Sequence, residues 1–213
     1  MDLYFSPLSC SMATRISLYE SGDAANFLEV DPKTKTLVGD GSDYLAIYPL
    51  GMVPSLRTDD GQLLTENAAI LQYVADRRPE SGLAPTEAIE RTRLHQWLCF
   101  IGTELHKGLF VPLLGKKTPA EMKAYVLANN LSRLAYLDTY LTGREFLLDR
   151  FTIADAYLAT VLNWTQVIPS IDMGLYPAVA DYLDRHRKRA SVAKAMAEEV
   201  VLWQAERARH KAA

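Results

Sequence analysis

Cys10 is the residue whose type and position point most directly to chemistry. It follows a strand-like run at Asp2–Phe5 and a turn at Ser6–Ser9, and it precedes an apolar stripe with helical spacing. The stripe comprises Met12, Ala13, Ile16 and Tyr19. We expect the thiol near the first turn of a helix, where unpaired N–H groups and the helix dipole favour a nucleophilic thiolate over a thiol with its ordinary pKa of about 8.5. A lone cysteine can equally be buried and inert, so Cys10 alone leaves both interpretations open.

Pro54, near the start of another strand-like run, gives a second clue. Met52, Val53 and Pro54 follow a turn signal at Tyr48–Gly51. A proline at the start of a strand suits an edge strand or a cis peptide bond, and an ordinary trans proline is the commoner case. In a cis bond the N–H and C=O of Val53 would turn outward, where they could bind an extended peptide as an added strand.

Glu66 and Asn67 form a third candidate, at the start of a helix expected from about Asn67 to Arg77. Asn67 is a good N-cap, so the N–H groups after it would form an anion site that fits a carboxylate. Glu66 could accept a hydrogen bond from an ammonium group. Together these two sites fit the head of an amino acid, although a capped helix with a solvent-exposed acid explains the same residues.

The elements that must position these residues occupy the first eighty positions. Strands are expected at Asp2–Phe5, Phe27–Val30, Val53–Arg57 and Gln62–Leu64, the last two joined by an Asp-Gly hairpin turn. Helices are expected after Cys10, ending around Ser21, and from Asn67 to Arg77, with a short helix between the second and third strands. This order, βαβ-α-ββα, predicts a small α/β domain with three layers.

The rest of the chain has a different character. After a Pro- and Gly-containing segment, helical periodicity covers residues 87–114, 119–141, 153–168, 176–188 and 190–209. We therefore predict an α/β domain at 1–79, a linker at 80–86 and an all-helical domain at 87–213. Thr152 and Asp155 match a capping box, to which we assign a structural role only. The tail from Glu198 to Ala213 is typical of a surface helix.

Composition excludes several other functions. The chain has 213 residues and a net charge of −3, which argues against nucleic acid as the main partner. Its two cysteines, Cys10 and Cys99, cannot form a disulfide framework and fit a reducing, cytoplasmic compartment. We expect no signal peptide, membrane span or metal site, because no suitable apolar run or histidine spacing occurs. Ala13 stands three residues after Cys10, so dithiol chemistry is not expected.

In their order and spacing, five segments resemble the glutathione transferase family, and most closely its bacterial beta class. They are Ser9–Ser11, Pro49–Pro54, Thr65–Ile70, Thr103–Lys107 and Phe151–Tyr157, and the resemblance extends over essentially the whole chain. It implies a thioredoxin-like N-terminal domain that binds glutathione as a co-substrate. It also implies a homodimer whose all-helical C-terminal domain contributes the pocket for a small apolar electrophile.

The resemblance assigns a role to each matching residue. Cys10 would lie beside the glutathione sulfur and could form a mixed disulfide with it, and His106 is the second catalytic candidate. The glutathione-binding set comprises Lys35 near the glycyl carboxylate, Met52, Val53 and cis-Pro54 at the cysteinyl part, Glu66 and Asn67 at the γ-glutamyl head, and Glu104 reaching toward the neighbouring subunit's glutathione. The electrophile pocket comprises His106, Lys107, Phe110 and Trp164.

Three positions depart from the family pattern. Asn67 stands where serine is common, Tyr48 where asparagine is usual, and Cys99 where close relatives have an asparagine that helps to bind glutathione. We expect Cys99 to be a small core residue, because the apolar Trp97, Leu98, Phe100 and Ile101 surround it in sequence.

The favoured hypothesis is an enzyme that conjugates the glutathione thiolate to small electrophiles. The alternative is a glutathione-dependent thiol–disulfide or peroxide reductase in which Cys10 is the nucleophile. Both require Cys10 and the same glutathione site, so the sequence does not separate them. A third hypothesis, from a different class, is a non-catalytic scaffold with this fold, because the three departures could have weakened the glutathione site.

Overall fold

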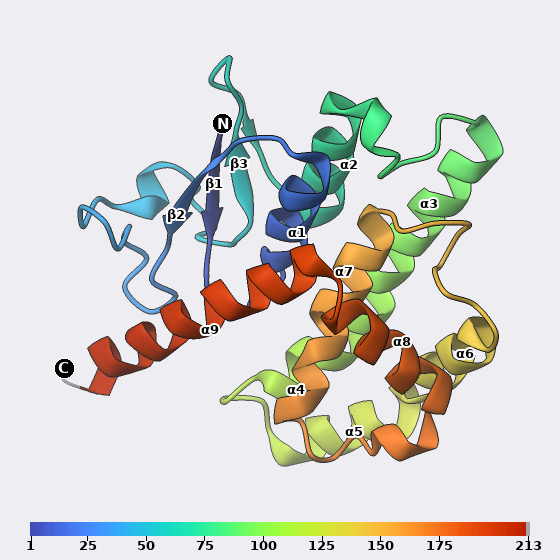
Figure 1. Cartoon of the computed structure of the whole chain (residues 1–213). Coiled ribbons are helices and arrows are strands. Elements are labelled where there is room, and N and C mark those ends of the chain that lie inside the picture. Colours follow the sequence, from blue (N-terminus) through green and yellow to red (C-terminus); the bar gives the residue numbers. More distant parts are fainter. Residues whose placement is uncertain (212–213) are drawn as a thin grey trace. The chain divides into compact units, whose positions relative to one another are not determined.

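The computed structural model describes residues 1–211, which form two compact units (Figure 1). The first unit is Met1–Leu83 together with the C-terminal helix α9 (Ala190–Lys211), and the second is Ala84–Arg189. This division differs from the expected domain boundaries in one respect. Helix α9 belongs to the α/β unit, where it lies against α1 (Met12–Ser21).

The first unit is built on a four-stranded mixed sheet. Its elements are β1 (Asp2–Phe5), α1, β2 (Asn26–Glu29), the 3-10 helix η1 (Tyr44–Ala46), β3 (Ser55–Arg57), β4 (Leu63–Leu64), α2 (Asn67–Arg77), the 3-10 helix η2 (Pro79–Ser81) and α9. The strand order is β2-β1-β3-β4, with β1 parallel to β2 and antiparallel to β3. Because β3 and β4 form the expected hairpin, the predicted order of strands and helices is confirmed.

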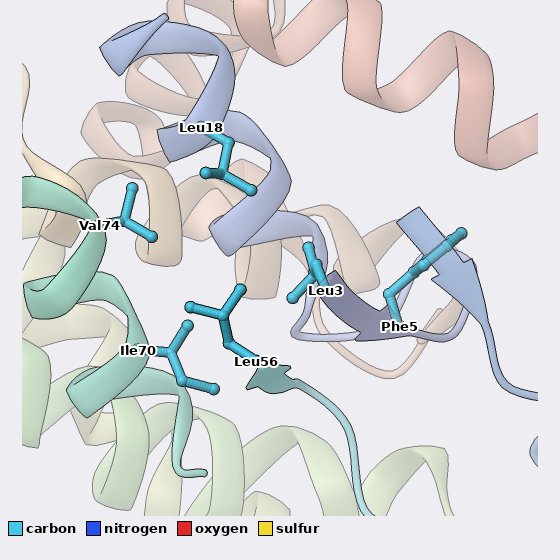
Figure 2. Close-up of a cluster of buried hydrophobic side chains, with 6 residues drawn as sticks. All are labelled: Leu3, Phe5, Leu18, Leu56, Ile70 and Val74. Carbon is cyan, nitrogen blue, oxygen red and sulfur yellow. The ribbon is translucent and has the colours of Figure 1, made fainter. Parts of the chain in front are cut away.

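Alternation along β1 directs side chains to the two faces of this sheet. Leu3 and Phe5 belong to a cluster that also contains Leu18 of α1, Leu56 of β3 and, from α2, Ile70 and Val74 (Figure 2). Tyr4 lies in a second cluster with Val30, Leu37 and Tyr44. The predicted apolar face of α2 is therefore a true core face.

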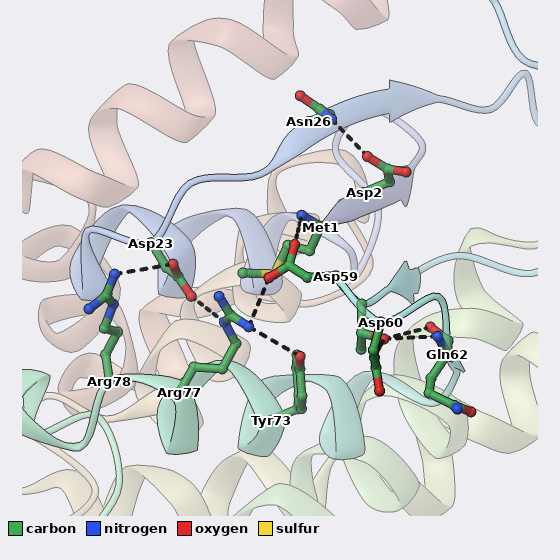
Figure 3. Close-up of polar contacts among 11 residues, drawn as sticks. Met1, Asp2, Asp23, Asn26, Asp59, Asp60, Gln62, Tyr73, Arg77 and Arg78 are labelled. Atoms are coloured by element: carbon green, nitrogen blue, oxygen red, sulfur yellow. Dashed lines mark hydrogen bonds and ion pairs between the residues drawn. The ribbon is translucent and has the colours of Figure 1, made fainter.

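Arg77 anchors the other end of α2 (Figure 3). Its guanidinium forms ion pairs with Asp23, just after α1, at 2.5 Å and with Asp59, in the β3–β4 turn, at 3.1 Å. The hydrogen bond from Arg77 lowers the pKa of Asp23, and the N-terminal ammonium of Met1 lies 2.6 Å from Asp59. These contacts hold the hairpin, α1 and α2 together on the side away from the first residue of α2.

The regular elements of the second unit, residues 84–189, are all helices. Its elements are α3 (Ala88–Phe100), the π-helix η3 (Ile101–Phe110), α4 (Val111–Leu114), α5 (Ala120–Asn130), α6 (Ser132–Leu141), α7 (Ile153–Leu162), the 3-10 helices η4 (Asn163–Val167) and η5 (Met173–Leu175), and α8 (Pro177–Arg187). The single helix expected over 119–141 is two helices separated at Leu131. The helix expected over 87–114 contains ten residues of π-helix, a geometry that is frequent near functional sites.

The capping box at the start of α7 is confirmed. The Asp155 carboxylate accepts hydrogen bonds from the Thr152 N–H at 2.8 Å and the Thr152 hydroxyl at 2.9 Å. It also accepts from the Leu147 N–H at 2.9 Å and the Tyr182 hydroxyl at 2.8 Å. Four donors on one fully buried carboxylate make this the polar centre of the second unit.

Candidate active site

Cys10 lies where the sequence predicts, between the β1 turn and α1. Helix α1 begins at Met12, two residues after the cysteine, and only 9% of the Cys10 surface is exposed. The thiol donates a hydrogen bond to the backbone carbonyl of Val53, with the sulfur 3.3 Å from the oxygen. Because Cys10 keeps a small exposed area and its thiol lies against the Val53 backbone, a ligand bound along that backbone would contact the sulfur.

The expected convergence of unpaired N–H groups on the thiol is wrong. The Ser11 N–H donates to the Ser9 hydroxyl at 3.3 Å, and the Met12 N–H donates to the Ser9 carbonyl at 3.1 Å. The Ala13 N–H donates to the Cys10 carbonyl at 3.2 Å. Because the tight turn before α1 already satisfies these donors, the contribution of the helix to a thiolate is its dipole.

Glu199 of α9 holds the turn that carries Cys10. Its carboxylate accepts a hydrogen bond from the Leu8 N–H at 2.7 Å and forms an ion pair with Arg15 at 3.0 Å. The Arg15 guanidinium also lies over the rings of Phe5 and Phe27, at 4.3 and 4.1 Å from their centroids. Glu199 is fully buried, and burial raises its pKa to about 7 against the opposing effect of Arg15.

The sequence interpretation missed Glu199, because it treated the tail as a surface helix. One signal was present in the first helix. Arg15 falls within the apolar stripe after Cys10, and a guanidinium buried in such a stripe requires a carboxylate partner from elsewhere in the chain. The sequence does not show which carboxylate that is.

The turn before β3 brings Lys35, Met52 and Val53 together. The Val53–Pro54 peptide bond is cis. The Lys35 ammonium donates to the Gly51 carbonyl at 2.9 Å, and the buried Tyr44 hydroxyl donates to the Met52 carbonyl at 2.8 Å.

Tyr44 was also missed by the sequence interpretation. Burial raises its pKa to about 12, so the phenol remains a hydrogen-bond donor throughout the neutral range. Together, Tyr44 and Lys35 bond the carbonyls of the residues just before Val53 and so support the turn that faces Cys10.

At the start of α2 the predicted N-cap is wrong by one residue. Glu66 occupies the N-cap position with φ +63°, an uncommon conformation for a residue other than glycine, and its exposed side chain makes no capping bond. Asn67 is the first helical residue, and its side chain points inward to the Cys10 carbonyl, 3.2 Å away. The N–H groups of Asn67 and Ala68 have no carbonyl four residues back within the helix, as at any helix start.

Hydrogen bonds connect several of these residues within the first unit. Cys10 bonds to Val53 through its thiol and to Asn67, the first residue of α2, through its carbonyl, and Lys35 bonds to Gly51, two residues before Val53. Glu66 precedes Asn67 as the N-cap residue of α2. A peptide-like molecule with a carboxylate, an ammonium group and a sulfur at its centre has a complement for each of these groups.

Three of the four residues predicted for the electrophile pocket lie together in the second unit. The rings of His106 and Trp164 are 5.1 Å apart, and those of Phe110 and Trp164 are 5.9 Å apart. His106 Nδ1 shares a hydrogen bond of 2.7 Å with the Tyr157 hydroxyl. Burial and the nearby Lys107 lower the pKa of His106 to about 4, so the imidazole is neutral at pH 7. Phe110 is fully buried and therefore supports Trp164 from within.

The remaining predicted residues of this unit are exposed or partly exposed. Lys107 is exposed, and the Glu104 carboxylate forms an ion pair with Arg133 at 3.0 Å. Cys99 is exposed on α3, so its prediction as a core residue is wrong. The reason is geometric: residues adjacent in a helical sequence point to different sides, and the apolar neighbours of Cys99 define a different face.

A cleft of about 590 Å³ elsewhere in the second unit contains none of these residues. Its walls include Arg93, Trp97, Tyr136, Tyr140 and Arg144. Within residues 1–211, no group of three or more His, Cys, Asp or Glu side chains could hold a metal ion. In the same range, no helix has both the length and the apolarity needed to cross a bilayer.

Comparison with known proteins gives the family. The profile of the glutathione S-transferase N-terminal domain matches residues 3–82, and that of the glutathione S-transferase C-terminal domain matches residues 132–185. The glutathione S-transferase GstA of Escherichia coli O157:H7 is 42% identical over 201 residues, which cover 93% of this chain and 98% of that protein.

Solved structures agree. A sphingomonad glutathione S-transferase complexed with glutathione is 41% identical with a TM-score of 0.88, covering 93% of this chain and 98% of that one. A bacterial beta class enzyme from Sphingomonas chungbukensis is 39% identical with the same TM-score and the same coverage. The expected thioredoxin-like domain followed by a helical domain is thereby confirmed, and the chain belongs to the glutathione S-transferase family, among enzymes of the bacterial beta class.

Proposed function

We propose that the first unit binds glutathione along the Val53 backbone, with the glutathione sulfur beside Cys10. The observation that carries this proposal is the hydrogen bond of 3.3 Å from the Cys10 thiol to the Val53 carbonyl, which brings the thiol to the backbone that would pair with the cysteinyl part. Lys35 would attract the glycyl carboxylate. The N-terminus of α2 would bind the γ-glutamyl carboxylate, and Glu66 would accept from its ammonium group.

In this arrangement the enzyme's task is to keep glutathione as a thiolate. A free thiol has a pKa near that of cysteine, about 8.5, and is mostly protonated at pH 7. A hydrogen bond from Cys10 and the dipole of α1 would stabilise the anion. The thiolate then attacks an electrophilic carbon and forms a C–S bond, while the leaving group departs with the bonding electron pair.

The second unit would contribute the surface for the electrophile. The partly exposed Trp164 ring packs against the buried His106 and Phe110 and presents an aromatic surface, and Lys107 adds a nearby cation. Because the pKa of His106 is about 4, its imidazole would act at neutral pH as an uncharged hydrogen-bonding group. An apolar, planar electrophile matches this surface.

A homodimer and a reducing, cytoplasmic compartment complete the proposal. Both cysteines are free, which fits a reducing environment. Glu104 would reach toward the partner's glutathione, as the family resemblance implies, and Arg133 would orient its carboxylate. Light scattering of the purified protein measures the mass: twice the chain mass supports the dimer, and the mass of one chain refutes it.

The location of Cys10 also favours a second activity, thiol–disulfide exchange. The Cys10 thiolate would attack one sulfur of a disulfide, forming a mixed disulfide and releasing the other sulfur as a thiolate. A glutathione thiolate would then attack the sulfur bonded to Cys10, release Cys10 as a thiolate and leave a new disulfide between the two other partners. The limited exposure of Cys10 next to the Val53 backbone suits such an attack on bound oxidised glutathione.

Two measurements on the Cys10→Ala variant separate the activities. If Cys10 only donates a hydrogen bond, conjugation of glutathione to an activated aryl halide should largely survive, whereas disulfide reduction should disappear. If conjugation is lost as well, although glutathione still binds, Cys10 is essential to both reactions.

Intact mass after incubation with oxidised glutathione gives an independent test. One added glutathionyl group on the wild type, absent from Cys10→Ser and retained by Cys99→Ser, supports the proposed site. Attachment to Cys99 alone, or no binding of glutathione at millimolar concentration, would overturn it.

A further inference from the structure

Asn67 begins α2, yet its side chain is turned away from solvent. The residue is 8% exposed, and its amide joins two groups near the start of α1. The amide nitrogen lies 3.2 Å from the Cys10 carbonyl, and the amide oxygen lies 3.1 Å from the Thr14 hydroxyl. Cys10 and Asn67 are 57 positions apart in the chain, so this bridge exists only in the folded unit.

The chemistry of the partners determines how the amide is oriented. The Cys10 carbonyl can only accept, so the NH₂ group of Asn67 must face it. The Thr14 hydroxyl, which is fully buried, then donates to the amide oxygen. Asn67 therefore uses one donor and one acceptor inside the protein, where the loss of either would leave a buried polar group without its partner.

The Asn67 amide bonds to the main chain of Cys10, and the Val53 carbonyl accepts a hydrogen bond from the Cys10 thiol. The Cys10 carbonyl accepts from both the Asn67 amide and the Ala13 N–H, each at 3.2 Å. The thiol donates to the Val53 carbonyl. Val53 and Asn67 both come from the segment that surrounds the β3–β4 hairpin, so this segment contacts Cys10 at its main chain and at its sulfur.

We propose that Asn67 is a positioning residue for Cys10, and that its side chain does not contact glutathione. At this position the ligand would meet only the backbone N–H. This refines the sequence expectation, which assigned Asn67 to the γ-glutamyl head without separating its backbone from its side chain. The consequence for glutathione rests on the proposed function, whereas the positioning of Cys10 does not depend on it.

The test measures Cys10 without any glutathione. In a Cys99→Ser background, iodoacetamide at a fixed neutral pH reports on Cys10 alone. We expect alkylation to slow about fivefold in Asn67→Ala, the factor that corresponds to the loss of a hydrogen bond worth about 1 kcal/mol. Asn67→Asp should slow it further, because a carboxylate oxygen would then face the Cys10 carbonyl and add negative charge near the thiolate.

Matched variants separate positioning from a general loss of structure. Asn26→Asp is the same substitution on β2, where the Asn26 amide donates to Asp2 at 2.8 Å (Figure 3), and it should leave Cys10 alkylation unchanged. Thr14→Val removes the second partner of the bridge and should slow alkylation less than Asn67→Ala, whereas Thr14→Ser keeps the hydroxyl and should restore the rate. Thermal unfolding confirms that each variant is folded at the assay temperature.

Glutathione binding by calorimetry then decides the role of the side chain. We expect Asn67→Ala to change the Kd for glutathione less than about twofold, although the same substitution slows Cys10 alkylation. A Kd raised about tenfold with unchanged alkylation would make Asn67 a ligand contact and overturn the proposal. Unchanged alkylation in Asn67→Ala and Asn67→Asp would also overturn it. If the wild type fails to bind glutathione, the proposed function fails, but the alkylation series still tests the bridge.

Discussion

Glu199 in the first unit and Asp155 in the second are both fully buried carboxylates, and both organise the backbone around them. Burial raises the pKa of each. Asp155 closes the start of α7 through Thr152, three residues before it. Glu199 instead accepts from the N–H of Leu8 and pairs with Arg15, at the other end of the chain.

The difference lies in distance along the sequence and in what each group supports. Asp155 and Thr152 are separated by three residues, so local chain geometry brings them together and a short motif predicts the bond. Glu199 and Leu8 are separated by 191 residues, so only the packing of α9 on α1 brings them together. Asp155 supports a helix, whereas Glu199 supports the turn that carries Cys10, which makes Glu199 the carboxylate with a direct relation to the site.

Glu199→Ala should have the largest effect. It removes the acceptor of the Leu8 N–H and leaves the partly exposed Glu198 as the remaining carboxylate beside the buried Arg15. We expect the free energy of unfolding to fall by about 3–5 kcal/mol and Cys10 alkylation to change. Denaturant unfolding and iodoacetamide kinetics measure the two effects. Normal alkylation in a destabilised variant would show that Glu199 is structural in the same way as Asp155.

Asp155→Ala should destabilise by about 3 kcal/mol, because it removes a helix cap and leaves the buried Tyr182 hydroxyl without its acceptor. The same two measurements apply. Here we expect unchanged Cys10 alkylation at a temperature where the variant is folded. A clear change in the alkylation rate would contradict the claim that Glu199, and not Asp155, supports the turn that carries Cys10.

The free energy of unfolding should depend on pH because of Glu199. Its pKa is raised from 4.5 to about 7, so the folded state binds a proton that the unfolded state has already lost. Between pH 5 and pH 8 this group should therefore reduce the stability of the wild type by about 2.5 kcal/mol as pH rises. Denaturant unfolding of the wild type and Glu199→Gln at both pH values gives the difference. A stability gap that does not depend on pH would contradict the raised pKa.

Glu198→Gln should have the smallest effect and serves as the exposed counterpart. Glu198 contacts the same Arg15 at 3.1 Å, but its side chain is 39% exposed. Because solvent screens a partly exposed carboxylate, we expect a loss of about 0–1 kcal/mol and unchanged Cys10 alkylation. A loss as large as that of Glu199→Ala would show that burial does not decide which carboxylate matters to Arg15.

Much of the fold was predictable because its signals are local. The Asp2–Phe5 strand, the Asp-Gly hairpin turn and the apolar face of α2 follow from alternation, turn chemistry and helical spacing. The sequence predictions were wrong where the buried face of a helix or its N-cap residue had to be assigned. Cys99 was placed in the core because of its neighbours in sequence, and Asn67 was taken as an N-cap although Glu66 holds that position.

Within the candidate site, the sequence was informative about residue types and less so about their partners. The family resemblance singled out Cys10, Val53 and His106, and the structure brings the first two together in one unit. Nothing in the pattern indicated that Asn67 would turn inward to Cys10 or that Tyr44 would hold the turn before β3. Such side-chain hydrogen bonds depend on angstrom-level placement of distant segments.

The sequence by itself determined which residues could do chemistry, the order of strands and helices, and the family to which the chain belongs. Periodicity and capping act over a few residues, and therefore remain visible in a linear chain. Only the tertiary structure decided that α9 joins the first unit, that Glu199 and Asn67 support Cys10, and that Cys99 is exposed. The physical reason is that burial and long-range pairing depend on which segments pack together, and packing is a property of the whole folded chain.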